Sequence, residues 1–346
     1  TGDIPKEAQS PNKYFFVHIR TRFEIKDGYL PTVQIKGSLV YKGNEWLKTS
    51  DIKGKDGKMH NRYILFGKEY STRVDLYLTQ TDYILFLEHY NVKDFEVIDG
   101  CWFWTDIGIF DEYIDKYKKI KMESKGALRT LAKLMLNNLY GKMASTKNSS
   151  FKVCYLKDNG AIGFIDQAEN EKTAGYIPIG SAITSYARNF TIRTAQKNYH
   201  GVNERGFIYA DTDSIHCDLA PDELVGIPVH DKNFCCWKLE SCWDEAIFTR
   251  QKTYIEHITH KDRQLIDKPY YDVKCAGMPE KCKQLFIAGL TGDIKDADKL
   301  SQKELEFARQ PRKLTDFKIG LKVPGKLLPK RIEGGVLLVD TTYEMR

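Results

Sequence analysis

The chain of 346 residues is long enough for about two domains, and its 53 basic and 47 acidic residues give a net charge of +6 that does not by itself identify a polyanionic partner. The eight cysteines are scattered, so the sequence is unlike a disulfide scaffold and fits a reducing compartment. No apolar run approaches the roughly 20 residues that span a bilayer, and we therefore expect no membrane partner.

The first 108 residues alternate turns with short runs that are typical of strands. The expected strands are Tyr14–Ile25, Tyr29–Ile35, Tyr63–Phe66, Arg73–Leu78 and Glu96–Trp104. A helix is expected at Thr81–Tyr90. This segment contains no group of residues suited to acid–base catalysis. We interpret it as one small α+β unit whose role is binding or scaffolding.

At Phe110 the hydrophobic period changes from two to about 3.6, which predicts helices over Phe110–Lys121 and Glu123–Ala144. One face of this region is polar and mostly cationic, and it comprises Lys121, Lys125, Arg129, Lys133, Asn137 and Tyr140. Like charges four residues apart on a helix repel by a few tenths of a kcal/mol, and a bound polyphosphate would offset that repulsion. We interpret the face as nucleotide-binding, with an ordinary solvated basic face as the alternative.

Residues 146–177 are polar, with a hairpin expected around residues 157–160. A helix follows at Ser181–Tyr199, and its spacing places Ile183, Tyr186, Phe190 and Ala195 on the inward face.

Two short strands are then expected on either side of Asp211-Thr212-Asp213. A tight turn there would hold two carboxylates close together, and a divalent cation would relieve their repulsion. Mg²⁺ suits such a site because it prefers carboxylate oxygens and keeps positions open for water and phosphates. The alternative is an Asx turn in which one Asp side chain caps its own backbone.

Further strands of the same sheet are expected at Arg250–Ile255 and Tyr270–Cys275. A charged helical stretch at Glu280–Arg312 leads into a basic, proline-broken segment and a last strand at Val336–Asp340. The cluster of His230, Cys235, Cys236 and Cys242 matches no standard ligand spacing, so we do not expect zinc there.

Four motifs stand in an order that resembles family B DNA polymerases. Tyr209–Ser214 resembles their third palm motif, and Lys133–Gly141 resembles their fingers-helix motif. Thr184–Arg188 matches the Thr-x-x-Ala-Arg element, and Lys252–Tyr254 matches the Lys-x-Tyr motif. The sequence is most similar to the protein-primed branch of bacteriophages and linear plasmids, and the resemblance extends over nearly the whole chain.

The resemblance implies an α+β fold in which an antiparallel palm sheet carries helical fingers, a thumb and two branch-specific insertions. The corresponding segments are residues 1–108 for the first insertion, 109–145 for the fingers, 146–177 for the second insertion, 178–276 for the palm and 277–346 for the thumb with a longer charged helical segment. The first insertion would contact a terminal protein and DNA, and the second would help enclose DNA and support strand displacement.

The resemblance also assigns roles to individual residues. Asp211 and Asp213 would be the catalytic carboxylates that hold two Mg²⁺ ions, with Mn²⁺ as a possible substitute. Lys121, Arg129, Lys133, Asn137 and Tyr140 would bind the incoming nucleotide. Thr184, Ala187, Arg188, Lys252 and Tyr254 would contact DNA.

The expected partners are primer-template DNA, deoxynucleoside triphosphates and a terminal protein that serves as primer. The resemblance implies the cytoplasm of a host cell for a viral protein, or a mitochondrion for one from a linear organellar plasmid.

The sequence departs from the family at several points. Its first palm motif, with a further metal-binding Asp, and its proofreading exonuclease domain are not found here, and Asn138 stands where Ser is usual. We therefore expect the carboxy-terminal part of a polymerase, a fragment or half of a split enzyme that needs an amino-terminal part for full activity. The alternatives are an inactive DNA-binding module that kept the fold, and a glycosyltransferase that uses Asp-x-Asp to hold a metal on a nucleotide diphosphate.

Overall fold

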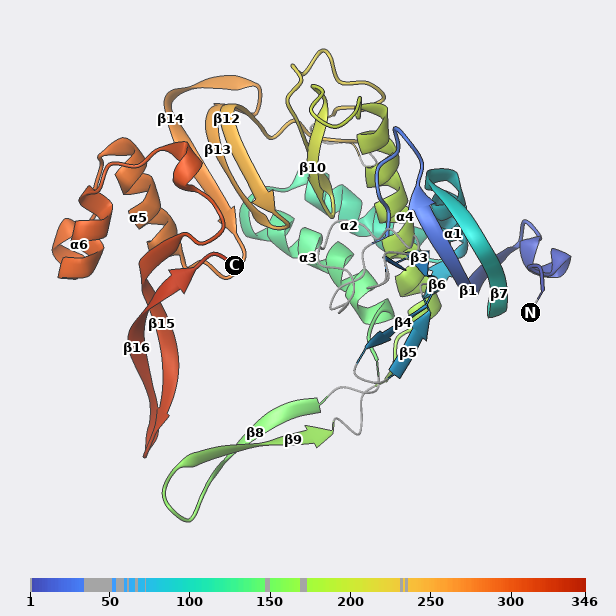
Figure 1. Cartoon of the computed structure of the whole chain (residues 1–346), viewed down its shortest axis with the longest axis horizontal. Helices are drawn as coiled ribbons and strands as arrows, with labels where there is room; N and C mark the ends of the chain where they lie inside the picture. Colours follow the sequence, from blue (N-terminus) through green and yellow to red (C-terminus); the bar gives the residue numbers. More distant parts are fainter. Residues whose placement is uncertain are drawn as a thin grey trace. The chain divides into compact units, whose positions relative to one another are not determined.

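The computed structural model describes residues 2–33, 52–53, 59–60, 62–65, 68–71, 73–146, 150–168, 173–230, 233 and 236–346. Figure 1 labels the helices and strands of the chain, which is divided into two compact units. The first unit comprises residues 1–147 and 172–227, and the second comprises residues 148–171 and 228–346. Both contain helices and antiparallel sheets, so the expected α+β class is confirmed.

The first unit opens with a three-stranded antiparallel sheet in which β1 (Lys13–Ile25) lies between β6 (Val74–Thr79) and β7 (Tyr90–Trp104). Alternate β1 side chains from Lys13 to Phe23 are buried, as the two-residue period of a half-buried strand requires. They form a core with Phe86 from α1 (Gln80–His89) and Tyr90. The expected strand at Tyr14–Ile25 and helix at Thr81–Tyr90 are confirmed.

The strand expected at Tyr29–Ile35 is wrong over residues 29–33, which form no ladder. Their polar backbone groups bond to side chains instead. The Tyr90 hydroxyl accepts the amide hydrogens of Thr32 and Val33 at 2.8 and 3.2 Å, and His89 Nδ1 bonds the Leu30 carbonyl at 2.7 Å. Residues 34 and 35 lie outside the described residues.

Two short hairpins follow in the first unit. They pair β2 (Ile52–Lys53) with β3 (Met59–His60), and β4 (Arg62–Leu65) with β5 (Lys68–Ser71). The expected strand at Tyr63–Phe66 corresponds to β4, although Phe66 lies outside the described residues. The strands expected at Arg73–Leu78 and Glu96–Trp104 correspond to β6 and to the second half of β7.

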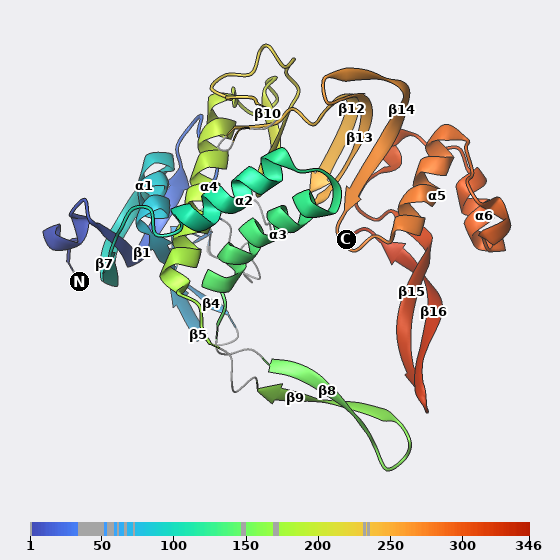
Figure 2. The same cartoon turned by 180° about the vertical axis from the view of Figure 1, so that it is seen from behind.

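The predicted pair of helices is present as α2 (Asp111–Glu123) and α3 (Gly126–Met143), which pack against each other (Figure 2). The backbone is extended at Ser124 and Lys125, with ψ angles of 161° and 168°, so the helix predicted from Glu123 begins at Gly126 instead. The Tyr113 hydroxyl of α2 donates to the Met135 carbonyl of α3 at 2.9 Å, which fixes the pairing of the two helices.

The helix predicted at Ser181–Tyr199 is α4 (Ile177–Lys197), which starts four residues earlier. The predicted inward face is wrong for three of its four members, because Ile183, Tyr186 and Phe190 are 39–61% exposed and Ala195 is buried. The side of α4 that packs inward is mostly polar instead. Its buried members are Gly180, Ser185, Thr191, Thr194 and Ala195.

The second unit contains a three-stranded antiparallel sheet in the order β12 (Ser241–Arg250), β13 (Thr253–Lys261) and β14 (Gln264–Cys275). The strand expected at Arg250–Ile255 is wrong at its centre, because the chain turns at Gln251 and Lys252 between β12 and β13. The strand expected at Tyr270–Cys275 is the end of β14. These strands form a sheet of their own and do not extend the hairpin that carries Asp211 and Asp213.

The stretch expected to be helical at Glu280–Arg312 is divided into α5 (Glu280–Thr291), a 3₁₀ turn (Ala297–Lys299) and α6 (Gln302–Arg309). Gly292 ends α5 because its φ of 78° is left-handed, a conformation that favours glycine. The chain continues through a 3₁₀ turn (Leu314–Asp316) into the hairpin of β15 (Lys322–Ile332) and β16 (Gly335–Glu344). The buried side chains of α5, β15 and β14 form one core.

The hairpin expected around residues 157–160 is confirmed. It joins β8 (Ser150–Leu156) to β9 (Ile162–Ala168), which pair only with each other among the described strands. None of the helices in the described part of the chain is long and apolar enough to cross a membrane.

Candidate active site

Asp211 and Asp213 lie at the tip of the hairpin formed by β10 (Phe207–Asp211) and β11 (Ser214–Cys217). Asp211 pairs with Ser214, so Thr212 and Asp213 form the turn. Thr212 has a φ of 55°, which is unusual for a β-branched residue. The Asp213 amide donates to the Asp211 carbonyl at 2.6 Å, and this bond across a single residue is that of a γ-turn.

Such a backbone costs on the order of 1–3 kcal/mol, so the surrounding structure must hold it in place. Hydroxyl groups supply part of that support. Thr212 Oγ1 donates to Asp211 Oδ1 at 3.1 Å, and Ser214 Oγ donates to the Asp211 carbonyl at 3.2 Å. From α4, Thr191 Oγ1 donates to the Thr212 carbonyl at 3.0 Å. Backbone strain of this kind is concentrated at functional sites in proteins.

The donor set of this turn fits a hard divalent cation. Asp211 is partly exposed and Asp213 is exposed, so both offer carboxylate oxygens, which are the ligands that Mg²⁺ prefers. Within the described ranges no group of three or more His, Cys, Asp or Glu side chains could hold a metal ion. The turn thus offers two carboxylates, and a divalent cation held there would need further ligands.

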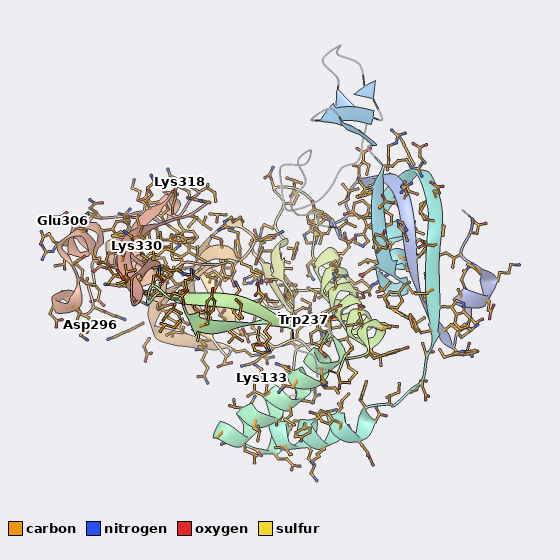
Figure 3. All side chains as sticks on the ribbon, turned by 90° about the horizontal axis from the view of Figure 1, so that it is seen from below. Lys133, Trp237, Asp296, Glu306, Lys318 and Lys330 are labelled. Carbon is orange, nitrogen blue, oxygen red and sulfur yellow. The ribbon has the colours of Figure 1, made fainter. Side chains whose placement is uncertain are left out.

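The three cations predicted to bind phosphates are brought together by α2 and α3. Burial lowers the pKa of Lys121 below its usual 10.5, and the nearby charges of Lys133 and Arg129 lower it further. Lys133 is exposed on α3 (Figure 3), as are Arg129, Asn137 and Tyr140 of the same helix. The structure thus places all five predicted nucleotide-binding residues on one helical pair.

The predicted DNA-binding residues of α4 have different surroundings. The Thr184 hydroxyl donates to the Ser181 carbonyl of its own helix at 2.8 Å, and Ala187 is exposed. Arg188 Nη1 forms an ion pair with Asp82 Oδ2 of α1 at 2.7 Å, and Ser185 Oγ donates to the same oxygen at 2.8 Å.

Sequence reasoning missed Asp82, Ser185 and Thr191. Asp82 follows Thr79, whose side chain caps α1 by accepting the Asp82 amide hydrogen. That capping pattern is visible in the sequence, but nothing in it connects Asp82 with a helix that lies 103 residues away.

Lys252 and Tyr254 belong to the second unit, whereas the Asp211–Asp213 turn belongs to the first. Lys252 lies in the turn between β12 and β13 with a φ of 55°, and its carbonyl accepts the Ala276 amide hydrogen at 2.9 Å. The Tyr254 ring stacks on Phe248 with 5.2 Å between ring centroids. Lys252 of the Lys-x-Tyr motif, like Thr212, therefore has a left-handed backbone conformation in the turn of a hairpin.

The cluster of histidine and cysteines in which we do not expect zinc belongs to the second unit. His230 Nδ1 accepts the Asn233 amide hydrogen at 3.0 Å, and Cys236 and Cys242 are partly buried free thiols. Cys235 lies outside the described residues.

Comparison with known proteins shows that this chain is similar to phage DNA polymerases in sequence and in structure. The chain is 40% identical over 340 residues to the DNA polymerase of Bacillus phage phi29, which covers 95% of this chain and 50% of that protein. It is 36% identical over its full length to the DNA polymerase of Bacillus phage B103, covering 53% of that protein. The phi29 DNA polymerase complexed with primer-template DNA and incoming nucleotide substrates superimposes with a TM-score of 0.72 and 37% identity over 96% of this chain and 51% of that one.

The chain thus spans about half the length of these relatives. Residues 2–225 match the family described as DNA polymerase type B, organellar and viral, and the chain belongs to that family.

Proposed function

We propose that this chain carries out template-directed DNA synthesis by nucleotidyl transfer, as part of a family B polymerase. The observation that carries the proposal is the strained hairpin tip that presents Asp211 and Asp213, in a chain whose relatives are phage DNA polymerases. In the reaction, the hydroxyl oxygen at the primer end attacks the α-phosphorus of the incoming nucleotide and pyrophosphate leaves.

Asp211 and Asp213 would hold Mg²⁺ or Mn²⁺, which when bound stabilises the charge that develops on the attacking and leaving oxygens. Lys121, Arg129 and Lys133 would bind the triphosphate through charge-assisted hydrogen bonds. Asn137 and Tyr140 would contact the base or sugar of the nucleotide. Their exposure on α3 leaves them accessible to such a ligand.

DNA would be bound by residues of both units. Thr184, Ala187 and Arg188 would contact the template, and Lys252 and Tyr254 the primer strand. Relatives are described in complex with primer-template DNA, which supports DNA as the partner. Protein priming through a terminal protein, and the cytoplasm of an infected host as the location, are part of the same proposal.

We also propose the domain assignment given above from sequence. In it, residues 1–108 bind the terminal protein and DNA, and residues 146–177 help enclose the DNA. The exposed Phe151, Tyr155 and Phe164 on β8 and β9 support a binding role for the second segment, since a two-stranded hairpin is marginally stable alone. Arg331 of β15 lies over the Phe164 ring at 5.1 Å.

The inactive module remains the second candidate, because the described residues supply only two carboxylates to the site. The glycosyltransferase alternative lacks support for two reasons. A glycosyltransferase would not need the cations of α2 and α3, and the family that the chain matches is that of DNA polymerases.

The test is the substitution Asp213→Asn, measured as single-nucleotide incorporation on a primer-template, with the portion of a phage relative that this chain does not match added. The change keeps the side-chain shape and removes one negative charge. The rate should fall by about a thousandfold, because several kcal/mol of charge stabilisation corresponds to that factor. DNA affinity should stay within about twofold.

Asp222→Asn is the matched control, since Asp222 is an exposed carboxylate of the same unit. It should incorporate nucleotides at the unchanged rate. If Asp213→Asn incorporated nucleotides at the normal rate, the turn would have only a structural role and the proposal would be refuted.

A further inference from the structure

Two threonines on the buried side of α4 have the same chemistry and burial but different hydrogen-bond partners. Thr191 is 6% exposed and Thr194 is 5% exposed. Thr194 Oγ1 donates to the Phe190 carbonyl of its own helix at 2.8 Å, which is common for threonine in helices. Thr191 Oγ1 donates instead to the Thr212 carbonyl at 3.0 Å, across to the turn between the two aspartates.

The bond from Thr191 acts on a single peptide group. The carbonyl of Thr212 and the amide of Asp213 belong to the same planar unit. The carbonyl oxygen accepts from Thr191, while the amide hydrogen is donated to the Asp211 carbonyl at 2.6 Å. The peptide is therefore held at both of its polar ends, and a rotation of its plane would break both bonds.

The held peptide is part of the backbone that leads into Asp213. Thr212 has a left-handed φ of 55°, which a β-branched residue avoids unless its surroundings impose it. Loss of the bond from Thr191 would free the turn to refold, so that Thr212 takes an ordinary backbone conformation. Such a change of the whole turn would alter the direction in which the Asp213 side chain leaves the backbone.

The helix that carries Thr191 is itself anchored at several points along its length. Arg188 and Ser185 bind Asp82 of α1, and Arg193 binds both carboxylate oxygens of Glu88 at 3.0 and 2.7 Å. Gln196 bonds the backbone of Gly28 and Leu30 at 2.8 and 2.7 Å. Thr191 is thus presented to the turn from a fixed support.

We propose that Thr191 is a positioning residue, which holds the Thr212–Asp213 peptide and thereby keeps the Asp213 carboxylate beside Asp211. The consequence for nucleotide incorporation rests on the proposed function, whereas the consequence for the turn does not. The competing interpretation is that Thr191 only satisfies a buried hydroxyl, as Thr194 does.

The first experiment measures the turn itself in the 346-residue chain. Thr191→Val preserves the shape of the side chain and removes the hydroxyl, Thr191→Ser keeps the hydroxyl, and Thr194→Val is the matched control. Amide hydrogen exchange of Asp213 should rise about five- to tenfold in Thr191→Val, the factor that corresponds to one net hydrogen bond. Crystal structures should show Thr212 leaving the left-handed region in Thr191→Val alone. An unchanged turn in that variant overturns the proposal.

The second experiment measures nucleotide incorporation in the presence of the portion of a phage relative that this chain does not match. Thr191→Val should lower kcat about tenfold and raise the Mg²⁺ concentration needed for half-maximal rate, while the KM for nucleotide stays unchanged. Thr191→Ser should restore both values, and Thr194→Val should match the unaltered chain even if its Tm falls equally. If Thr191→Val and Thr194→Val lose only Tm, the role of Thr191 is structural and the proposal is wrong.

The two experiments separate the inference from the proposed function. An unaltered chain that incorporates no nucleotide refutes the proposed function, and the turn conformation in the variants still decides whether Thr191 positions Asp213.

Discussion

At the scale of single residues, α2 and α3 hold three cations close together against the repulsion between their charges. This cation group comprises Lys121, Arg129 and Lys133. Lys121 is partly buried near Arg129 and Lys133, and both burial and like charge disfavour its protonated form. A triphosphate bound among them would supply opposite charge and favour that form again. The lowered pKa of Lys121 should therefore rise when a triphosphate binds.

The first prediction concerns the protons that accompany nucleotide binding. The free chain releases the Lys121 proton at a lower pH than an ordinary lysine does, whereas a bound triphosphate raises the pKa of Lys121. Between these two pKa values, binding takes up a proton, and affinity falls as pH rises through the lower one. Calorimetric titrations in alkaline buffers of different ionisation enthalpy measure this uptake.

Two substitutions make the assignment specific. Lys121→Arg should abolish the uptake, because a guanidinium stays protonated throughout that range. Lys119→Arg, at an exposed position of the same helix, should leave it unchanged. If both variants took up the same number of protons on nucleotide binding, Lys121 would not be part of the nucleotide site.

The site residues that could be predicted from the sequence are those whose neighbours in the structure are also close along the chain. Asp211 and Asp213 are separated by one residue, and Arg129 and Lys133 by one helical turn, so their proximity follows from the secondary structure. Thr191 and Asp82 could not be found in this way, because their partners lie 21 and 103 residues away in the chain. Only the packing of α4 against α1 and the β10–β11 hairpin brings these groups together.

At the scale of elements, α6 shows how one buried carboxylate can join three segments of the second unit. Glu304 accepts the Ser301 amide hydrogen at 2.8 Å and so completes a capping box. It also pairs with Lys281 of α5 at 2.6 Å. A Cβ on Gly325 of β15 would meet the Glu304 carboxylate at 2.7 Å, so the glycine allows the strand to approach closely.

The second prediction concerns the stability of this junction. Glu304→Ala should lower the free energy of unfolding of the second unit by about 2 kcal/mol, less than a fully buried pair because Lys281 is 45% exposed. Glu306→Ala, at an exposed position of the same helix (Figure 3), should change it by less than about 0.5 kcal/mol. Chemical denaturation measures both.

The pH dependence of the Glu304 contribution has a defined sign. Burial raises the pKa of Glu304, but hydrogen bonds from Lys281 and Ser301 outweigh it and lower the pKa below the usual 4.5. A carboxylate with a lowered folded-state pKa stabilises above its unfolded value and loses that contribution as pH falls through the folded value. The stability difference between the unaltered chain and Glu304→Ala should therefore shrink below about pH 4.5. A difference that stays constant down to pH 2 would contradict the assignment.

Element types were predicted better than element ends. The periods of two and 3.6 identified β1, α1, α2 and α3, but the interruption at Gln251–Lys252 and the end of α5 at Gly292 depend on single left-handed residues. Gly292 could be read as a helix end, since glycine takes that conformation readily. Lys252 could not, because a lysine with φ of 55° is imposed by tertiary contacts.

At the scale of the whole molecule, the residues predicted to act in polymerisation are distributed over both units. Asp211, Asp213 and the cation group belong to the first unit, whereas Lys252 and Tyr254 belong to the second, and the division falls between residues 227 and 228. The motif order indicated a single polymerase, but sequence patterns carry no signal for where compact units separate. Incorporation would require both units to engage the same primer-template.

The last prediction concerns the number of metal ligands in the proposed function. Mg²⁺ requires near-octahedral oxygen coordination, and Asp211 and Asp213 of the β10–β11 turn would supply two carboxylates. The purified 346-residue chain should therefore extend a primer at most weakly. Adding the portion of a phage relative that this chain does not match, about half of that protein, should restore extension if it supplies the further carboxylate. The restored activity should disappear with Asp213→Asn in this chain and persist with Asp222→Asn. Full extension by the unaided chain would show that two carboxylates are enough.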